Sequence, residues 1–155
     1  MSSSELREQS GLASSRVACT LGIDHGSKRI GLAVSDPGGK VALPAGTLES
    51  RGFERDLAAI RRVVEARQVE RIVVGLPIHM DGRSGPQAEA AREFAERLAE
   101  ELGLPVDTLD ERWTTREAER ALRATGRSGK KKRAVIDSVA AALLLRTYLE
   151  REGGG

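Results

Sequence analysis

Two short segments rich in apolar residues lie so close together in the chain that they restrict what it can fold into. Val17–Asp24 (VACTLGID) and Arg29–Asp36 (RIGLAVSD) are separated only by the sequence HGSK. A short connection that contains glycine is typical of a β-hairpin, because parallel strands need a much longer crossover. We therefore expect these two segments to be neighbouring antiparallel strands.

The rest of the chain alternates between helical and strand-like patterns. A weaker third strand is predicted over Lys40–Leu48, and apolar residues from Phe53 to Val64 then recur at the spacing of one helix face. Arg71–Gly75 (RIVVG) is a compact apolar run, typical of a buried parallel strand. The remaining predicted elements are a helix opened by the capping-box pair Ser84 and Gln87 and ended by Gly103, a strand over Val106–Glu111, a short helix opened by Thr114 and Glu117 and ending near Gly126, and a long helix over Lys131–Glu150. This order predicts an α/β fold, with a mixed five-stranded sheet flanked by helices.

Length and composition fit one folded domain. With 155 residues, 39% of them hydrophobic and 31% charged, the chain is neither collagen-like, nor a coiled coil, nor wholly disordered. We expect a flexible leader over residues 1–16, a single domain over 17–150 and a disordered tail over 151–155. The leader has no apolar stretch typical of a secretory signal, and the longest apolar run, Val139–Leu145, is too short to span a membrane. These features predict a cytoplasmic protein without a membrane segment. The sequence does not distinguish between a monomer and a homodimer.

Positive charge is concentrated in one segment although the net charge is only +2. No acidic residue interrupts the basic cluster, which consists of Arg123, Arg127, Lys130, Lys131, Lys132 and Arg133. Such a cluster suits contact with a nucleic-acid backbone, or it is simply a solvated basic loop. Aromatic residues make up only 3% of the chain, which argues against modules that stack bases on aromatic platforms, such as RRM domains and OB-folds.

Three acidic residues lie where an α/β fold gathers its functional groups. Asp24 and Glu111 end predicted strands, and Asp137 lies among apolar residues of the last helix. A buried carboxylate must be paired, protonated or bound to a cation. Three carboxylates suit Mg²⁺ or Mn²⁺, and two such ions can support phosphodiester hydrolysis. Strand alternation sends Asp110 and Glu111 to opposite faces, so only one of them can join the cluster.

Structural explanations for the same acids remain open. Asp24 could cap a turn, Glu111 could be a solvated strand end bonded to Arg112, and Asp137 could pair with Arg133 one helical turn earlier. The two histidines, His25 and His79, show no zinc-binding spacing, and we interpret them as turn or substrate-edge residues.

Four motifs resemble the YqgF family, also called RuvX, within the RNase H-like superfamily. They are LGIDHGSKRIGLAVSD, GLPIHMDGRSGPQA, LDERWTTREAE and KKKRAVIDSVAAALLL, in the family's order, within about residues 17–149. His25 stands where the family usually has an apolar residue, and His79 where it usually has asparagine. The resemblance implies an RNase H-like fold in which Asp24, Glu111 and Asp137 are the catalytic, metal-binding acids, with Mg²⁺ or Mn²⁺ as the cofactor.

The resemblance also implies a nuclease that processes the 5′ end of the 16S rRNA precursor, a structured RNA. An older interpretation of the family is a Holliday junction resolvase acting on branched DNA, and a nuclease-like protein that only binds RNA is a third possibility. Lys28 and Arg29, in the GSKR turn beside Asp24, form a plausible phosphate cradle that would bind nucleic acid together with the basic cluster. The same turn resembles the phosphate loop of sugar kinases and actin, but an ATPase of that superfamily needs two such domains.

Overall fold

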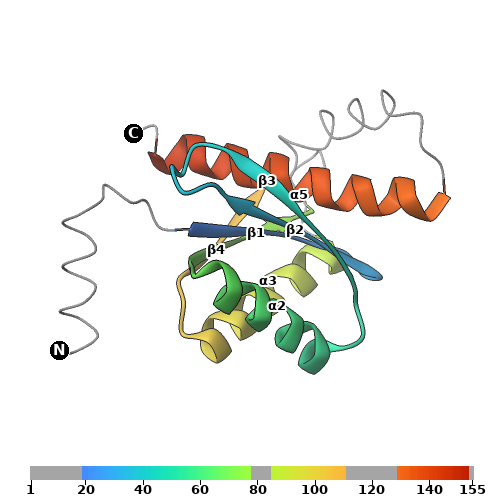
Figure 1. The fold of residues 1–155 in the computed structure, drawn as a ribbon. Helices are drawn as coiled ribbons and strands as arrows, with labels where there is room; N and C mark the ends of the chain where they lie inside the picture. Colours follow the sequence, from blue (N-terminus) through green and yellow to red (C-terminus); the bar gives the residue numbers. More distant parts are fainter. Residues whose placement is uncertain (1–18, 78–84, 111–128, 154–155) are drawn as a thin grey trace.

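The computed structural model describes residues 19–77, 85–110 and 129–153. These residues form one five-stranded sheet with α5 on one face and α2 and α3 on the other (Figure 1). In chain order the elements are β1 (Cys19–His25), β2 (Arg29–Ser35), β3 (Ala42–Glu49), α2 (Phe53–Arg67), β4 (Val69–Leu76), α3 (Pro86–Leu102), β5 (Val106–Asp110) and α5 (Gly129–Gly153). In this part of the chain, no helix has both the length and the apolar character needed to cross a membrane.

The sheet is mixed, as the sequence predicts. Its strand order is β3-β2-β1-β4-β5, with β2 antiparallel to both β1 and β3. A hydrogen bond of 2.9 Å from the Gly26 amide to the Arg29 carbonyl closes the predicted hairpin. β4 and β5 run parallel to β1 and bring their carboxyl ends to the same edge of the sheet.

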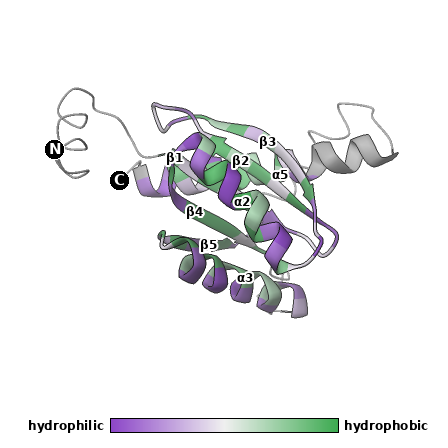
Figure 2. Ribbon diagram, turned by 60° about the horizontal axis from the view of Figure 1, so that its bottom comes forward, coloured by the Kyte–Doolittle hydropathy of each residue, from purple (hydrophilic) through white to green (hydrophobic). Residues whose placement is uncertain are grey.

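Each face of the sheet has its own hydrophobic core. Leu21, Ile23 and their neighbours pack against α2 and α3, and Ala33, Val73 and Leu109 pack against α5. Figure 2 shows hydrophilic and hydrophobic residues alternating along α2 and α3, as expected for helices with one face on a sheet. In β1 the odd-numbered residues therefore face α2 and α3, and the even-numbered residues face α5.

Several element boundaries differ from the predicted ones. β1 extends to His25 because His25 still pairs with Ile30 of β2. α3 begins at Pro86 with an extended Gly85 as its N-cap, one residue after the predicted N-cap Ser84, which lies outside the described residues. α5 begins two residues before, and ends three residues after, the predicted Lys131–Glu150. The helix predicted between Thr114 and Gly126 lies outside the described residues.

A buried tyrosine fastens the C-terminal half of α5 to the sheet. The Tyr148 hydroxyl donates a 2.5 Å hydrogen bond to Asp107 of β5 and accepts one of 3.2 Å from the Arg71 guanidinium of β4. Tyr148 is 4% exposed. Burial and then the bond to Asp107 raise the pKa of the phenol to about 12. The neutral phenol therefore stabilises the folded state.

We predict that Tyr148→Phe lowers the free energy of unfolding by about 1–3 kcal/mol at neutral pH, because Asp107 and Arg71 lose a partner. In the parent protein, the folded state holds the phenolic proton more tightly than the unfolded chain does. This contribution is complete below about pH 10 and is lost as the pH rises towards about 12. Tyr148 is the chain's one tyrosine, so phenolate absorbance reports on it directly. Ionisation near pH 10 in the folded protein would contradict this assignment.

Candidate active site

A cleft lies at the carboxyl end of β1, where the β1–β2 turn meets α3 and α5. It has a volume of about 280 Å³ and is lined by residues 25–29 of the hairpin, Gln87 and Ala90 of α3, and Asp137 of α5. Ser27 and Lys28 are exposed at the tip of the turn. The cleft therefore combines a carboxylate, two basic side chains and backbone amides.

Asp24 faces α5, and two glycines let the part of α5 that carries Asp137 pack closely on the same face of the sheet. A methyl group on Gly22 would lie 2.9 Å from the Leu145 Cβ, and one on Gly31 would overlap the Asp137 carbonyl. Gly31 is the direct strand partner of Asp24. Asp24 follows Gly22 by two residues and so faces α5 as well. The backbone at Asp137 is thus packed against the residue paired with Asp24.

Asp137 has a partner that local sequence rules do not predict. Its Oδ2 atom accepts a hydrogen bond of 2.8 Å from Nε of Arg29, and the two side chains are 20% and 30% exposed. The sequence suggested Arg133 as the ion-pair partner of Asp137, and it suggested that Arg29 binds a phosphate of the nucleic acid. The observed ion pair instead joins the first residue of β2 to α5, and it uses one of the two carboxylate oxygens. It compensates the negative charge of Asp137 at a partly buried position.

The third predicted acid, Glu111, lies outside the described residues, as do Arg127 and His79. Lys130, Lys131, Lys132 and Arg133 belong to the first turns of α5. Across residues 19–77, 85–110 and 129–153, no three His, Cys, Asp or Glu side chains form a group that could hold a metal ion. Asp24 and Asp137 supply the oxygen donors that Mg²⁺ and Mn²⁺ prefer, but two carboxylates are an incomplete set.

The alternation of side chains along β5 indicates which face of the sheet Glu111 would occupy. Asp107 bonds Tyr148 of α5, and Leu109 packs in the core beneath α5, so the odd-numbered residues of β5 face the same side as Asp24. Continued alternation would place Glu111 on that side and Asp110 on the other. The position of Glu111 stays a prediction.

His25 belongs to the opposite face of the sheet. Its ring stacks on Phe94 of α3 with 4.4 Å between ring centroids and 26° between planes, and Phe53 meets Phe94 edge-on. Burial lowers the pKa of His25, although Asp56 and Asp24 oppose the shift, so the ring is neutral at pH 7. The sequence interpretation as a turn residue is wrong, because His25 is the last residue of β1.

The β1–β2 turn is also tied to the segment that precedes α2. The Ser50 amide donates a 2.9 Å hydrogen bond to the Lys28 carbonyl. The buried carboxylate of Asp56 in turn accepts hydrogen bonds from the Ser50 hydroxyl at 2.7 Å and the Arg51 amide at 2.9 Å. These contacts fix the turn that carries Lys28 and Arg29.

Comparison with known proteins identifies the family. A family model described as "RuvX: Holliday junction resolvase" matches residues 18–151. This chain belongs to the RuvX family. A relative from Moorella thermoacetica, named "Putative pre-16S rRNA nuclease", is 48% identical over 133 residues, covering 86% of this chain and 95% of the relative. A relative of the same name from Anaeromyxobacter dehalogenans is 48% identical over 132 residues, covering 85% and 96%.

Solved structures place this RuvX chain in the RNase H-like fold. Thermus thermophilus RuvC in complex with a Holliday junction matches with a TM-score of 0.57 and 19% identity, covering 88% of this chain and 97% of RuvC. The fowlpox virus Holliday junction resolvase matches with a TM-score of 0.52 and 10% identity, covering 86% and 98%. At these identities the likeness concerns the fold. The predicted α/β architecture and the family resemblance are confirmed.

The contact between Gly31 and α5 generates a prediction about this RuvX protein. Gly31→Ala should lower the free energy of unfolding by about 1–3 kcal/mol, because the added methyl group forces β2 and α5 apart. Gly38→Ala is the matched control, since a methyl group there meets only the Asp36 carboxylate, at 3.4 Å, and should change stability by about 0.5 kcal/mol or less. Urea unfolding of both variants measures the difference, and equal stabilities would contradict the close approach.

Proposed function

We propose that this protein is a divalent-metal-dependent nuclease that hydrolyses phosphodiester bonds and processes the 5′ end of the 16S rRNA precursor in the cytoplasm. The observation that carries the proposal is the position of Asp24 and Asp137 on one face of an RNase H-like sheet, beside the basic β1–β2 turn. The names of the relatives from Moorella and Anaeromyxobacter support the choice of RNA as substrate.

The residue roles follow from charge and position. Asp24 and Asp137 would hold Mg²⁺ or Mn²⁺ together with Glu111, and the bound ions would supply water activation and stabilise the leaving oxygen. Arg29 holds the Asp137 carboxylate at the edge of the cleft. Lys28 and the basic cluster would contact the phosphates of the nucleic acid.

The direct test is 5′-end mapping of 16S precursor RNA after incubation with the purified protein and Mg²⁺ or Mn²⁺. Cleavage should occur with either ion and cease in excess EDTA. A four-way DNA junction, incubated in parallel, tests the resolvase activity that the family description names. Binding of RNA without cleavage in any metal would instead favour a non-catalytic RNA-binding protein and overturn the proposal.

We predict that Glu111→Gln lowers the cleavage rate by at least about 10²-fold, the scale expected when a group that stabilises the transition state is lost. Asp110→Asn should retain most of the activity, because alternation points Asp110 to the opposite face. Cleavage rates are compared after circular dichroism has shown that both variants are folded. Equal losses would show that the strand phase is wrong.

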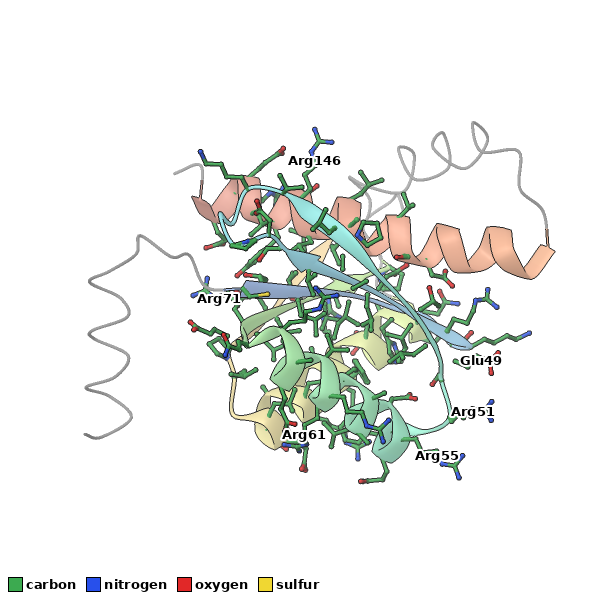
Figure 3. All side chains as sticks on the ribbon, in the orientation of Figure 1. Glu49, Arg51, Arg55, Arg61, Arg71 and Arg146 are labelled. Carbon is green, nitrogen blue, oxygen red and sulfur yellow. The ribbon has the colours of Figure 1, made fainter. Side chains whose placement is uncertain are left out.

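We predict that replacing Lys130, Lys131 and Lys132 with alanine lowers the magnitude of the negative slope of log K against log [salt] by about 2–3, if each lysine neutralises one phosphate. Arg146→Ala is the control. Arg146 projects from the outer side of α5 and pairs with Glu150, so its loss should leave the slope unchanged (Figure 3). Anisotropy titrations with labelled RNA in EDTA give the slope. A slope unaffected by the triple substitution would assign these lysines to solvent.

A further inference from the structure

We propose that the cleft contains a nucleobase subsite, in which an unpaired base stacks on the ring of His25 and is flanked by Ala90 and Gln87 of α3. This inference rests on the proposed nuclease function and adds to it a contact with a base. The evidence comes from the packing of His25 and from the composition of the cleft wall.

The first argument is that His25 is held rigidly. Phe94 covers one face of the imidazole ring, and Phe94 is itself buried and supported edge-on by Phe53 at 5.9 Å between centroids. The Arg97 guanidinium lies 3.6 Å from the centroid of the Phe53 ring. His25 is half-buried and lines the cleft, so we infer that the ring face opposite Phe94 is the one that a ligand reaches. A ring held in this way loses little conformational entropy when a base stacks on it.

The second argument is the row of residues beside His25. Gln87, Ala90 and Phe94 are spaced by three and four positions in α3, so they share one face of the helix. Ala90 is exposed and small, which leaves room next to the imidazole ring. Gln87 is exposed and carries both an amide donor and a carbonyl acceptor, the groups that bind the edge of a base.

The third argument is the position relative to the acids. His25 directly follows Asp24 in β1, and alternation turns the two side chains to opposite faces of the sheet end. A nucleotide whose phosphate lies near Asp24 and Lys28 could therefore place its base against His25. RNA-binding proteins commonly stack unpaired bases on histidine and other aromatic rings.

The test is an abasic scan in EDTA, which prevents cleavage. Fluorescein-labelled single-stranded RNA is taken from the mapped cleavage region, and one nucleotide at a time is made abasic. Anisotropy should show one position at which loss of the base weakens binding by about 5- to 150-fold, the equivalent of one stacked base. His25→Ala should weaken binding of intact RNA by a similar factor and abolish the effect of the abasic site. His25→Phe should restore both.

Two further variants separate stacking from other effects. Ala90→Leu fills the space beside the ring at an exposed helix position, so it should mimic His25→Ala without loss of stability. Lys28→Ala should weaken intact and abasic RNA equally, because it removes a phosphate contact. If no abasic position weakens binding, or if His25→Ala weakens binding of intact and abasic RNA equally, the proposed base subsite is wrong. Metal-dependent cleavage would then still support the nuclease function. If RNA neither binds nor is cleaved, both proposals fail.

Discussion

The close packing of α5 on the β1–β2 hairpin is the constraint on which the rest of the site depends. At Gly22 and Gly31 the strand backbone meets α5 without a side chain between them. The atoms that these glycines approach belong to Asp137, Ala141 and Leu145, which recur every four residues along α5. A side chain at Gly31 would lift the helix at the turn that carries Asp137. The two glycines therefore determine how closely Asp137 approaches the strand that carries Asp24. Tyr148 fixes the C-terminal half of the same helix to the sheet.

The acidic side chains on this face need a compensating positive charge for the folded state to be stable. Like-charged carboxylates near one another destabilise a fold unless positive charge compensates them. Arg29 provides such a charge in the described part of the cleft through its bond to Asp137. Because the pair is only partly buried, exchanging the Arg29 partner for a bound cation requires less desolvation than it would in the core. The same arginine thus stabilises the metal-free protein at the edge of the cleft.

Much of the fold could be predicted from local patterns, but the site could be predicted only in part. The HGSK connection fixed the hairpin, and the apolar run ending at Gly75 indicated a parallel strand, because both signals are local. The pairing of Arg29 with Asp137 spans 108 positions, so the local rule that favoured Arg133 missed it. The position of Gln87 in the cleft wall and the stacking of His25 on Phe94 also depend on contacts between residues far apart in the sequence. His25 had one available signal, its odd-numbered phase in β1, which turns it away from Asp24 and towards α3.

The central claim is that Asp24 and Asp137 form one cation site, and Mn²⁺ binding without nucleic acid tests it most directly. Isothermal titration of the parent protein, Asp24→Asn, Asp137→Asn and Glu70→Gln is the measurement. Glu70 is the control, since it is an exposed carboxylate near the start of β4, at the other end of the sheet. Each aspartate variant should bind Mn²⁺ at least about 10-fold more weakly, since even loss of a group that supports a ligand costs 10–100-fold. Glu70→Gln should bind like the parent. Unchanged Mn²⁺ affinity in either folded aspartate variant would contradict the account.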